Sequence, residues 1–212
     1  MDRFSVSIKG VLEVDGKLLL RKNERHEYEL LGGRLEKEDT SAEYRLVTEF
    51  CEESGIKIEV LEQREPWLYE IGLKNIIIVP FVCKALNIPE TMEDEDGGTL
   101  HWIDEAKVED IFMPQGYKDT IAGDVPHKSY SIAATSVFKL IPNYVDSDYF
   151  VEIKVKEEDE EIISLPLPHS HSPRDFIHSQ LEAKYKGAQL LFDTTSIDHE
   201  RDTIVLSYTI DD

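Results

Sequence analysis

The chain has 212 residues, of which 41% are hydrophobic, so it can bury one large core or two small ones. Its formal net charge of −21 makes a nucleic-acid backbone or an anionic membrane a poor partner. We expect neither partner, and because the sequence shows no signal peptide and no apolar run of membrane-spanning length, we expect a cytoplasmic protein.

The first predicted elements form a β-hairpin. Residues 4–13 predict a strand, Asp15-Gly16 is a strong signal for a tight turn, and residues 17–22 predict the returning strand. A polar loop follows. A short strand predicted at residues 28–31 then leads into the flexible pair Gly32-Gly33.

Three arginines flank this glycine pair. Arg21 and Arg25 precede it, and Arg34 follows it directly. Guanidinium groups at these positions are candidates for binding the phosphate oxygens of an anionic substrate. The alternative is that they are ordinary basic side chains on the surface.

One helix is predicted between the glycine pair and Gly55, which is a natural stop signal. Thr40 is predicted to cap its start, with Glu43 completing a capping box. Apolar residues recur at helical spacing and predict a buried stripe. The members of this stripe are Ala42, Leu46, Val47 and Phe50.

A second face of the predicted helix carries three carboxylates, Glu49, Glu52 and Glu53. Like charges at this spacing destabilise a helix by roughly 0.2–0.5 kcal/mol per pair, and acids near a helix C-terminus oppose its dipole. A divalent cation would remove this penalty, and oxygen ligands suit magnesium or manganese. The alternative is a solvated acidic face in an acidic protein.

The segment of residues 32–56 resembles the Nudix box. That motif is a glycine, five residues, Glu, seven residues, Arg-Glu, an aliphatic residue, any residue, Glu-Glu, any residue, Gly and an aliphatic residue. The second half of the motif matches well. Glu49 corresponds to the Glu of Arg-Glu, Phe50 to the apolar position, Glu52-Glu53 to the acidic pair and Gly55-Ile56 to the end.

The first half of the motif departs from the family pattern. Five residues separate Gly33 from Asp39, which stands where the family has Glu, and the helix arrives one residue late. Thr48 therefore replaces the box arginine, which in the family helps to orient the carboxylates. Arg45, one turn earlier, is the nearby substitute.

The resemblance implies an α/β/α sandwich with a mixed sheet and hydrolysis of the pyrophosphate bond in a nucleoside diphosphate linked to another moiety. Glu49 and Glu53 would be direct ligands of Mg²⁺ or Mn²⁺, and Glu52 a ligand through water or a local base. The carbonyl of Gly32 would complete the shell. In the acidic stretch of residues 87–98, Glu93 or Glu95 is the candidate for activating the attacking water; a solvated loop is the alternative.

The strands after the helix are predicted at residues 56–72, with a bend at Pro66, and at residues 75–86 and 99–103. Trp67 is a candidate for stacking on a nucleotide base, with core packing as the alternative. A short helix is predicted at residues 104–112. The two cysteines, Cys51 and Cys83, are predicted to be core thiols, with no zinc site and no disulfide framework.

A domain boundary is predicted near residue 125, which gives a Nudix domain over residues 1–125 and a small α+β module over residues 126–212. Residues 130–141 are predicted as a strand that leaves the first domain. The order ββαββ is predicted from strands at 149–156, 162–167, 190–193 and 203–210 and a helix from 173 to about 186. This module could cover the pocket, join two subunits as a homodimer or bind another protein.

Two other functions remain open. The first alternative is a catalytically weak Nudix fold that senses a nucleotide, with the C-terminal module transmitting the signal or dimerising. Thr48 and Asp39 favour it, and the intact Glu49, Glu52 and Glu53 disfavour it. The second alternative is an acidic protein-interaction module without a ligand. Which nucleotide is bound does not follow from the sequence, because fold does not determine substrate.

Overall fold

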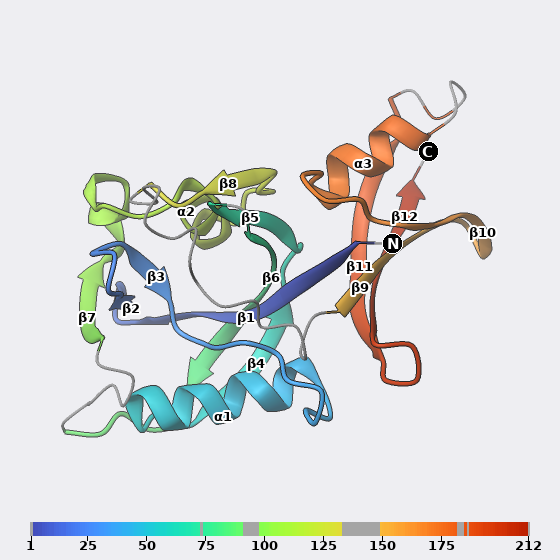
Figure 1. Cartoon of the computed structure of the whole chain (residues 1–212). Coiled ribbons are helices and arrows are strands. Elements are labelled where there is room, and N and C mark those ends of the chain that lie inside the picture. Colours follow the sequence, from blue (N-terminus) through green and yellow to red (C-terminus); the bar gives the residue numbers. More distant parts are fainter. Residues whose placement is uncertain are drawn as a thin grey trace.

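The structure is a computed structural model that describes residues 2–72, 74–90, 98–132, 149–181, 185 and 187–211. The strands of this part of the chain form one hydrogen-bonded network, with helices on both of its faces (Figure 1). The strands are β1 (Arg3–Val14), β2 (Lys17–Lys22), β3 (Tyr28–Leu30), β4 (Ile58–Gln63), β5 (Trp67–Ile71), β6 (Lys74–Ala85), β7 (Thr99–Asp104), β8 (Lys128–Tyr130), β9 (Tyr149–Glu157), β10 (Glu160–Pro166), β11 (Gln189–Asp198) and β12 (Thr203–Asp211). The helices are α1 (Ala42–Ser54), the 3₁₀ helix η1 (Glu105–Asp110), α2 (Gln115–Ala122) and α3 (Pro173–Gln180).

The sheet is mixed, as predicted, and β1 lies at its centre. β1 pairs in parallel with β6 and antiparallel with β2 and β9. β6 also pairs antiparallel with β4 and β5, while β2 pairs with β3 and β7. The predicted hairpin joins β1 to β2, and its turn residues Asp15 and Gly16 both have positive φ angles, 52° and 74°. The central strand therefore reaches both the glycine pair and the C-terminal strands.

Two hydrophobic cores make this sheet the middle layer of an α/β/α sandwich. On one face, α1 packs its buried Leu46 and Phe50 against β1 and neighbouring strands. On the other face, Tyr117 of α2 packs against Trp67 of β5. Figure 1 shows α1 below the sheet and α2 above it. The predicted fold class is confirmed.

The described residues between 149 and 211 have the predicted order ββαββ, and we call them the C-terminal module. β9 pairs with β10 along one edge and with β12 along the other. The first residues of β9 also pair with β1, with Tyr149 opposite Phe4 and Phe150 opposite Arg3. The larger core continues across this junction into the module. The position of the domain boundary stays a prediction.

Three details of α1 differ from the sequence prediction. Ser41, not Thr40, caps the helix, because Ser41 is the last extended residue and its Oγ accepts a hydrogen bond from the Tyr44 amide at 3.1 Å. Val47 was predicted to be buried, but it is exposed. Cys51 was predicted to be a core thiol and is also exposed, whereas Cys83 is buried as predicted. Val47 and Cys51 are exposed because the buried face of the helix includes Glu49 and Glu53 instead.

The region predicted as one bent strand at residues 56–72 is two strands, β4 and β5, and the break falls at Pro66 as expected. β8 ends at Tyr130, and the rest of the strand predicted at residues 130–141 lies almost wholly outside the described residues. Among the helices that the structure describes, none combines the length and the apolar character needed to cross a bilayer.

The two faces of α1 give a direct test of this packing. Phe50→Ala should lower the free energy of unfolding by about 3–5 kcal/mol, because it leaves a cavity beneath the helix. Val47→Ala, on the exposed face of the same helix, should change it by less than about 0.5 kcal/mol. Urea denaturation monitored by circular dichroism measures both values. Equal losses in the two variants would mean that the helix is rotated relative to the described structure.

Candidate active site

The glycine pair brings the backbone between β3 and α1 close to two other segments. Gly32 has a φ angle of 120°, and a Cβ atom there would overlap the carbonyl of Ile8 in β1. A Cβ atom on Gly33 would overlap the carboxylate of Glu49. Glycine is therefore required at position 32 by the backbone of β1, whereas a side chain at position 33 would displace the Glu49 carboxylate.

Two of the three predicted carboxylates converge on this glycine pair. Glu49 and Glu53 lie one helical turn apart and are only 7% and 5% exposed. Glu53 Oε2 accepts a hydrogen bond from the Gly32 amide at 2.9 Å. Glu52 is exposed to solvent, so it lies apart from the buried pair.

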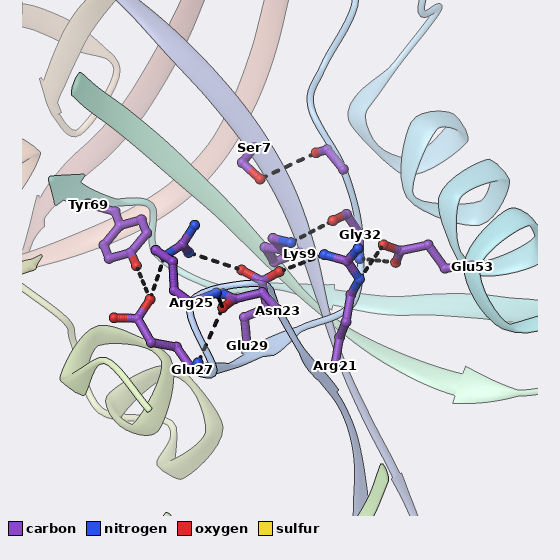
Figure 2. Close-up of polar contacts among 11 residues, drawn as sticks. Ser7, Lys9, Arg21, Asn23, Arg25, Glu27, Glu29, Gly32, Glu53 and Tyr69 are labelled. Atoms are coloured by element: carbon purple, nitrogen blue, oxygen red, sulfur yellow. Dashed lines mark hydrogen bonds and ion pairs between the residues drawn. The ribbon is translucent and has the colours of Figure 1, made fainter. Parts of the chain in front are cut away.

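Two cationic side chains, one buried and one partly buried, lie at the Glu53 end of the site (Figure 2). Lys9, on β1, is 6% exposed, and its Nζ donates a hydrogen bond to the Gly32 carbonyl at 2.6 Å. Arg21, on β2, approaches Glu53 with an Nε–Oε1 distance of 3.6 Å and also donates to Glu29 at 3.1 Å. Arg21 was a candidate from the sequence, but Lys9 was not, because it continues the polar positions of Ser5 and Ser7 in an alternating strand.

The environment of Glu53 changes its protonation. Burial raises the pKa of Glu53 from 4.5 to about 7, although Lys9, the Gly32 amide and Arg21 act in the opposite direction. The carboxyl group therefore gains and loses its proton near neutral pH. Additional positive charge at this position would favour the ionised form.

Arg45 lies at the Glu49 end of the site, as the sequence suggested. It forms an ion pair with Glu49, and its Nε lies 3.8 Å from Asp39 Oδ2. Asp39, the residue in place of the family Glu, also accepts a hydrogen bond from the Glu36 amide at 2.7 Å. Thr48 instead donates its hydroxyl to the Tyr44 carbonyl within the helix. Arg45 and Asp39 thus hold Glu49 from the N-terminal side of α1.

Behind Arg21 lies a second polar cluster, centred on the fully buried Glu27 (Figure 2). Arg25 Nε donates to Glu27 Oε2 at 2.8 Å, and Ser131 Oγ donates to Glu27 Oε1 at 2.7 Å. Tyr69 Oη lies within 3.4 Å of the same carboxylate. Arg25 is thus engaged by an internal acid, and any phosphate would have to compete with Glu27 for it.

The other predicted site residues lie elsewhere. Trp67 is fully buried and its Nε1 donates to Thr120 Oγ1 at 3.0 Å, so its ring is a core element and has no face open for a nucleotide base. Arg34 is half-buried and forms a β-bridge with Ser7. Glu93 and Glu95 lie outside the described residues.

The donor set suits a magnesium ion that is shared with a substrate. Magnesium usually takes one or two protein carboxylates and completes its shell with water and phosphate oxygens. Glu49 and Glu53 supply two such carboxylates, and their burial gives a cation a desolvated negative site. Within the described ranges, no group of three or more His, Cys, Asp or Glu side chains is arranged to hold a metal ion. The carbonyl of Gly32 is already bound by Lys9.

The raised pKa of Glu53 predicts a pH-dependent stability. Between about pH 4.5 and about pH 7 the folded protein keeps a proton that the unfolded chain releases, so the free energy of unfolding falls as pH rises, by about 3 kcal/mol in total. Glu53→Gln should remove this slope. Urea denaturation with EDTA across that pH range measures it in both proteins. Identical pH profiles would show that Glu53 titrates normally.

Comparison with known proteins adds fold similarity only. No protein-family model and no curated protein matches the chain. Similar solved structures include a Nudix-family hydrolase from Clostridium perfringens (TM-score 0.49, 13% identity, covering 57% of this chain and 95% of that chain). A second is a MutT protein from Methanosarcina mazei Go1 (TM-score 0.49, 16% identity, covering 56% of this chain and 91% of that chain). A third is an ADP-ribose pyrophosphatase from Streptococcus suis (TM-score 0.43, 17% identity, covering 56% of this chain and 87% of that chain). At these identities, the likeness concerns the fold and not the reaction. The chain resembles Nudix hydrolases in its sandwich fold and in the box residues that this fold brings together.

Proposed function

We propose that the protein hydrolyses the pyrophosphate bond of a nucleoside diphosphate linked to another moiety, in a reaction that depends on Mg²⁺ or Mn²⁺. The observation that carries this proposal is the pair of buried carboxylates, Glu49 and Glu53, against the Gly32-Gly33 backbone. Burying two acids one turn apart costs stability, and such a pair suits a site that binds a cation.

The chemistry explains why such a site suits a pyrophosphate. The bridge resists attack by water because its oxygens are negatively charged. A bound divalent metal supplies positive charge to these oxygens and increases the acidity of water. Glu49 and Glu53 would hold the metal. Arg21, which lies beside Glu53, would orient the substrate phosphates, with Arg34 as a second candidate.

Proton transfer needs a base near the attacking water. Glu93 and Glu95 are the proposed sources, and Glu52 is a third, because it is a solvent-exposed carboxylate next to Glu53. A nucleotide approaching a chain of net charge −21 would be repelled as a free anion. We therefore propose that it arrives as its metal complex.

The second candidate is a Nudix fold that binds a nucleotide without efficient turnover. The Gly32 carbonyl accepts from Lys9, and Glu49 is paired with Arg45, so internal cations already occupy positions near both ends of the acidic pair. A metal would have to compete with them. Measuring turnover distinguishes the two candidates, because only the hydrolase cleaves the bound nucleotide efficiently.

Release of phosphate or nucleotide from a panel of nucleoside diphosphate compounds, with magnesium or manganese and an EDTA control, tests the proposal. Glu53→Gln should reduce turnover by more than about 100-fold, because even outer-shell changes at metal sites cost about 10–100-fold. Glu43→Gln, on the exposed first turn of the same helix, should retain wild-type turnover.

Metal-dependent cleavage of one compound class would support the hydrolase and identify its substrate. Near wild-type turnover in Glu53→Gln would refute the assignment of the site. If no compound is cleaved but a nucleotide raises the melting temperature, the sensor is the better explanation.

A further inference from the structure

The loop of residues 34–41 joins the glycine pair to α1 and is held by the C-terminal module. Tyr149 Oη donates a hydrogen bond to the Glu36 carbonyl at 2.9 Å. Lys37 Nζ lies 2.9 Å from Asp202 Oδ2. The first contact joins residues that are 113 positions apart in the sequence, and the second joins residues that are 165 positions apart.

The same loop carries the acid that holds Arg45. The Glu36 amide donates to Asp39 Oδ2 at 2.7 Å, and the Asp39 amide donates back to the Glu36 carbonyl at 3.2 Å. Asp39 in turn lies beside Arg45, which pairs with Glu49. The Glu36 carbonyl therefore accepts two hydrogen bonds, one from the Tyr149 hydroxyl and one from the Asp39 amide. A continuous series of polar contacts runs from the C-terminal module to a buried carboxylate of the site.

We propose that Tyr149 and Asp202 of the C-terminal module are positioning residues. Tyr149 holds the loop at Glu36 and Asp202 holds it at Lys37. The loop fixes Glu49 through Asp39 and Arg45. This inference rests on the proposed function, since it assigns Glu49 a role as metal ligand. It gives the C-terminal module a specific task, which is to hold the loop in the conformation that the site needs.

The position of both module residues suits this task. Tyr149 is 1% exposed and lies in the larger core, at the point where β9 pairs with β1. Burial and the neighbouring acids raise the pKa of Tyr149 to about 12, so its hydroxyl remains a donor at neutral pH. Asp202 lies in the turn between β11 and β12, and its carbonyl accepts from the Phe150 amide at 2.9 Å. Both contacts therefore start from one rigid corner of the module.

Two matched pairs of variants test the proposal in the full chain. Tyr149→Phe removes only the hydroxyl that reaches Glu36. Its control, Tyr185→Phe, removes a hydroxyl of the same core that bonds to Glu157 inside the module, also at 2.9 Å. Asp202→Asn weakens the ion pair with Lys37, and asparagine tolerates the φ angle of 48° found there. Its control is Glu161→Gln, whose ion pair with Lys154 is similar in length and exposure.

Two readouts separate positioning from general stability. The first is the affinity for Mn²⁺ alone, measured by electron paramagnetic resonance. It should fall about five-fold in Tyr149→Phe, the factor that one hydrogen bond of average net strength supplies. Asp202→Asn should show a smaller loss, because its ion pair is one-third exposed. The second readout is hydrogen exchange of the amides in residues 34–41, which should become faster in both variants. The controls should change neither readout.

The outcomes are distinct. Faster exchange in the loop together with weaker Mn²⁺ binding, in the two test variants only, supports the proposal. Unchanged exchange, or equal changes in the controls, overturns it even if the enzyme is active. A wild-type protein that binds no Mn²⁺ and cleaves nothing overturns the proposed function and the assignment of Glu49 as a metal ligand. In that case the exchange data still decide whether the module orders the loop.

Discussion

The burial of two carboxylates on one helix is the constraint on which the rest of the site depends. Removing an ion from water costs several kcal/mol unless partners compensate for it. Here the compensation comes from different parts of the chain: Lys9 and the Gly32 amide at the Glu53 end, and Arg45 at the Glu49 end. The glycine pair allows this convergence, because any side chain at Gly33 would displace Glu49.

This compensation also connects the site to the far end of the chain. Within the sandwich, the loop that supplies Asp39 is fixed at its start, where Arg34 bridges Ser7 and the Leu35 amide donates to the Val6 carbonyl at 2.9 Å. Contacts from Tyr149 and Asp202 add fixed points outside the sandwich. Because β9 pairs with β1, these points share one sheet with Lys9. The module and the acidic helix are therefore mechanically connected through both the loop and the sheet.

Local features of the sequence predicted most of the fold, and they named Glu49, Glu53 and Arg45, which the structure places at the candidate site. Short-range patterns account for the hairpin, the helix before Gly55, its acidic spacing and the ββαββ order. The glycine pair lies where the backbone comes close to β1 and α1. What the sequence could not show depends on contacts between distant residues. Lys9 is a site residue only because β3 ends against β1, and Val47 is exposed because Glu49 and Glu53 occupy the buried face. Likewise, the roles of Tyr149 and Asp202 exist only after the chain has folded back on itself.

The internal cations make the choice between hydrolase and sensor a question of charge balance. Lys9 and Arg21 reduce the negative charge that would attract a free metal ion, so a site of this kind should bind metal more weakly when no nucleotide is present. A metal–nucleotide complex changes this balance, because its phosphate oxygens can accept the hydrogen bond that Arg21 now donates to Glu29. Glu53, which Arg21 approaches at 3.6 Å, would then be released toward the metal. Cations that weaken resting metal affinity would in this way become the groups that bind the substrate phosphates.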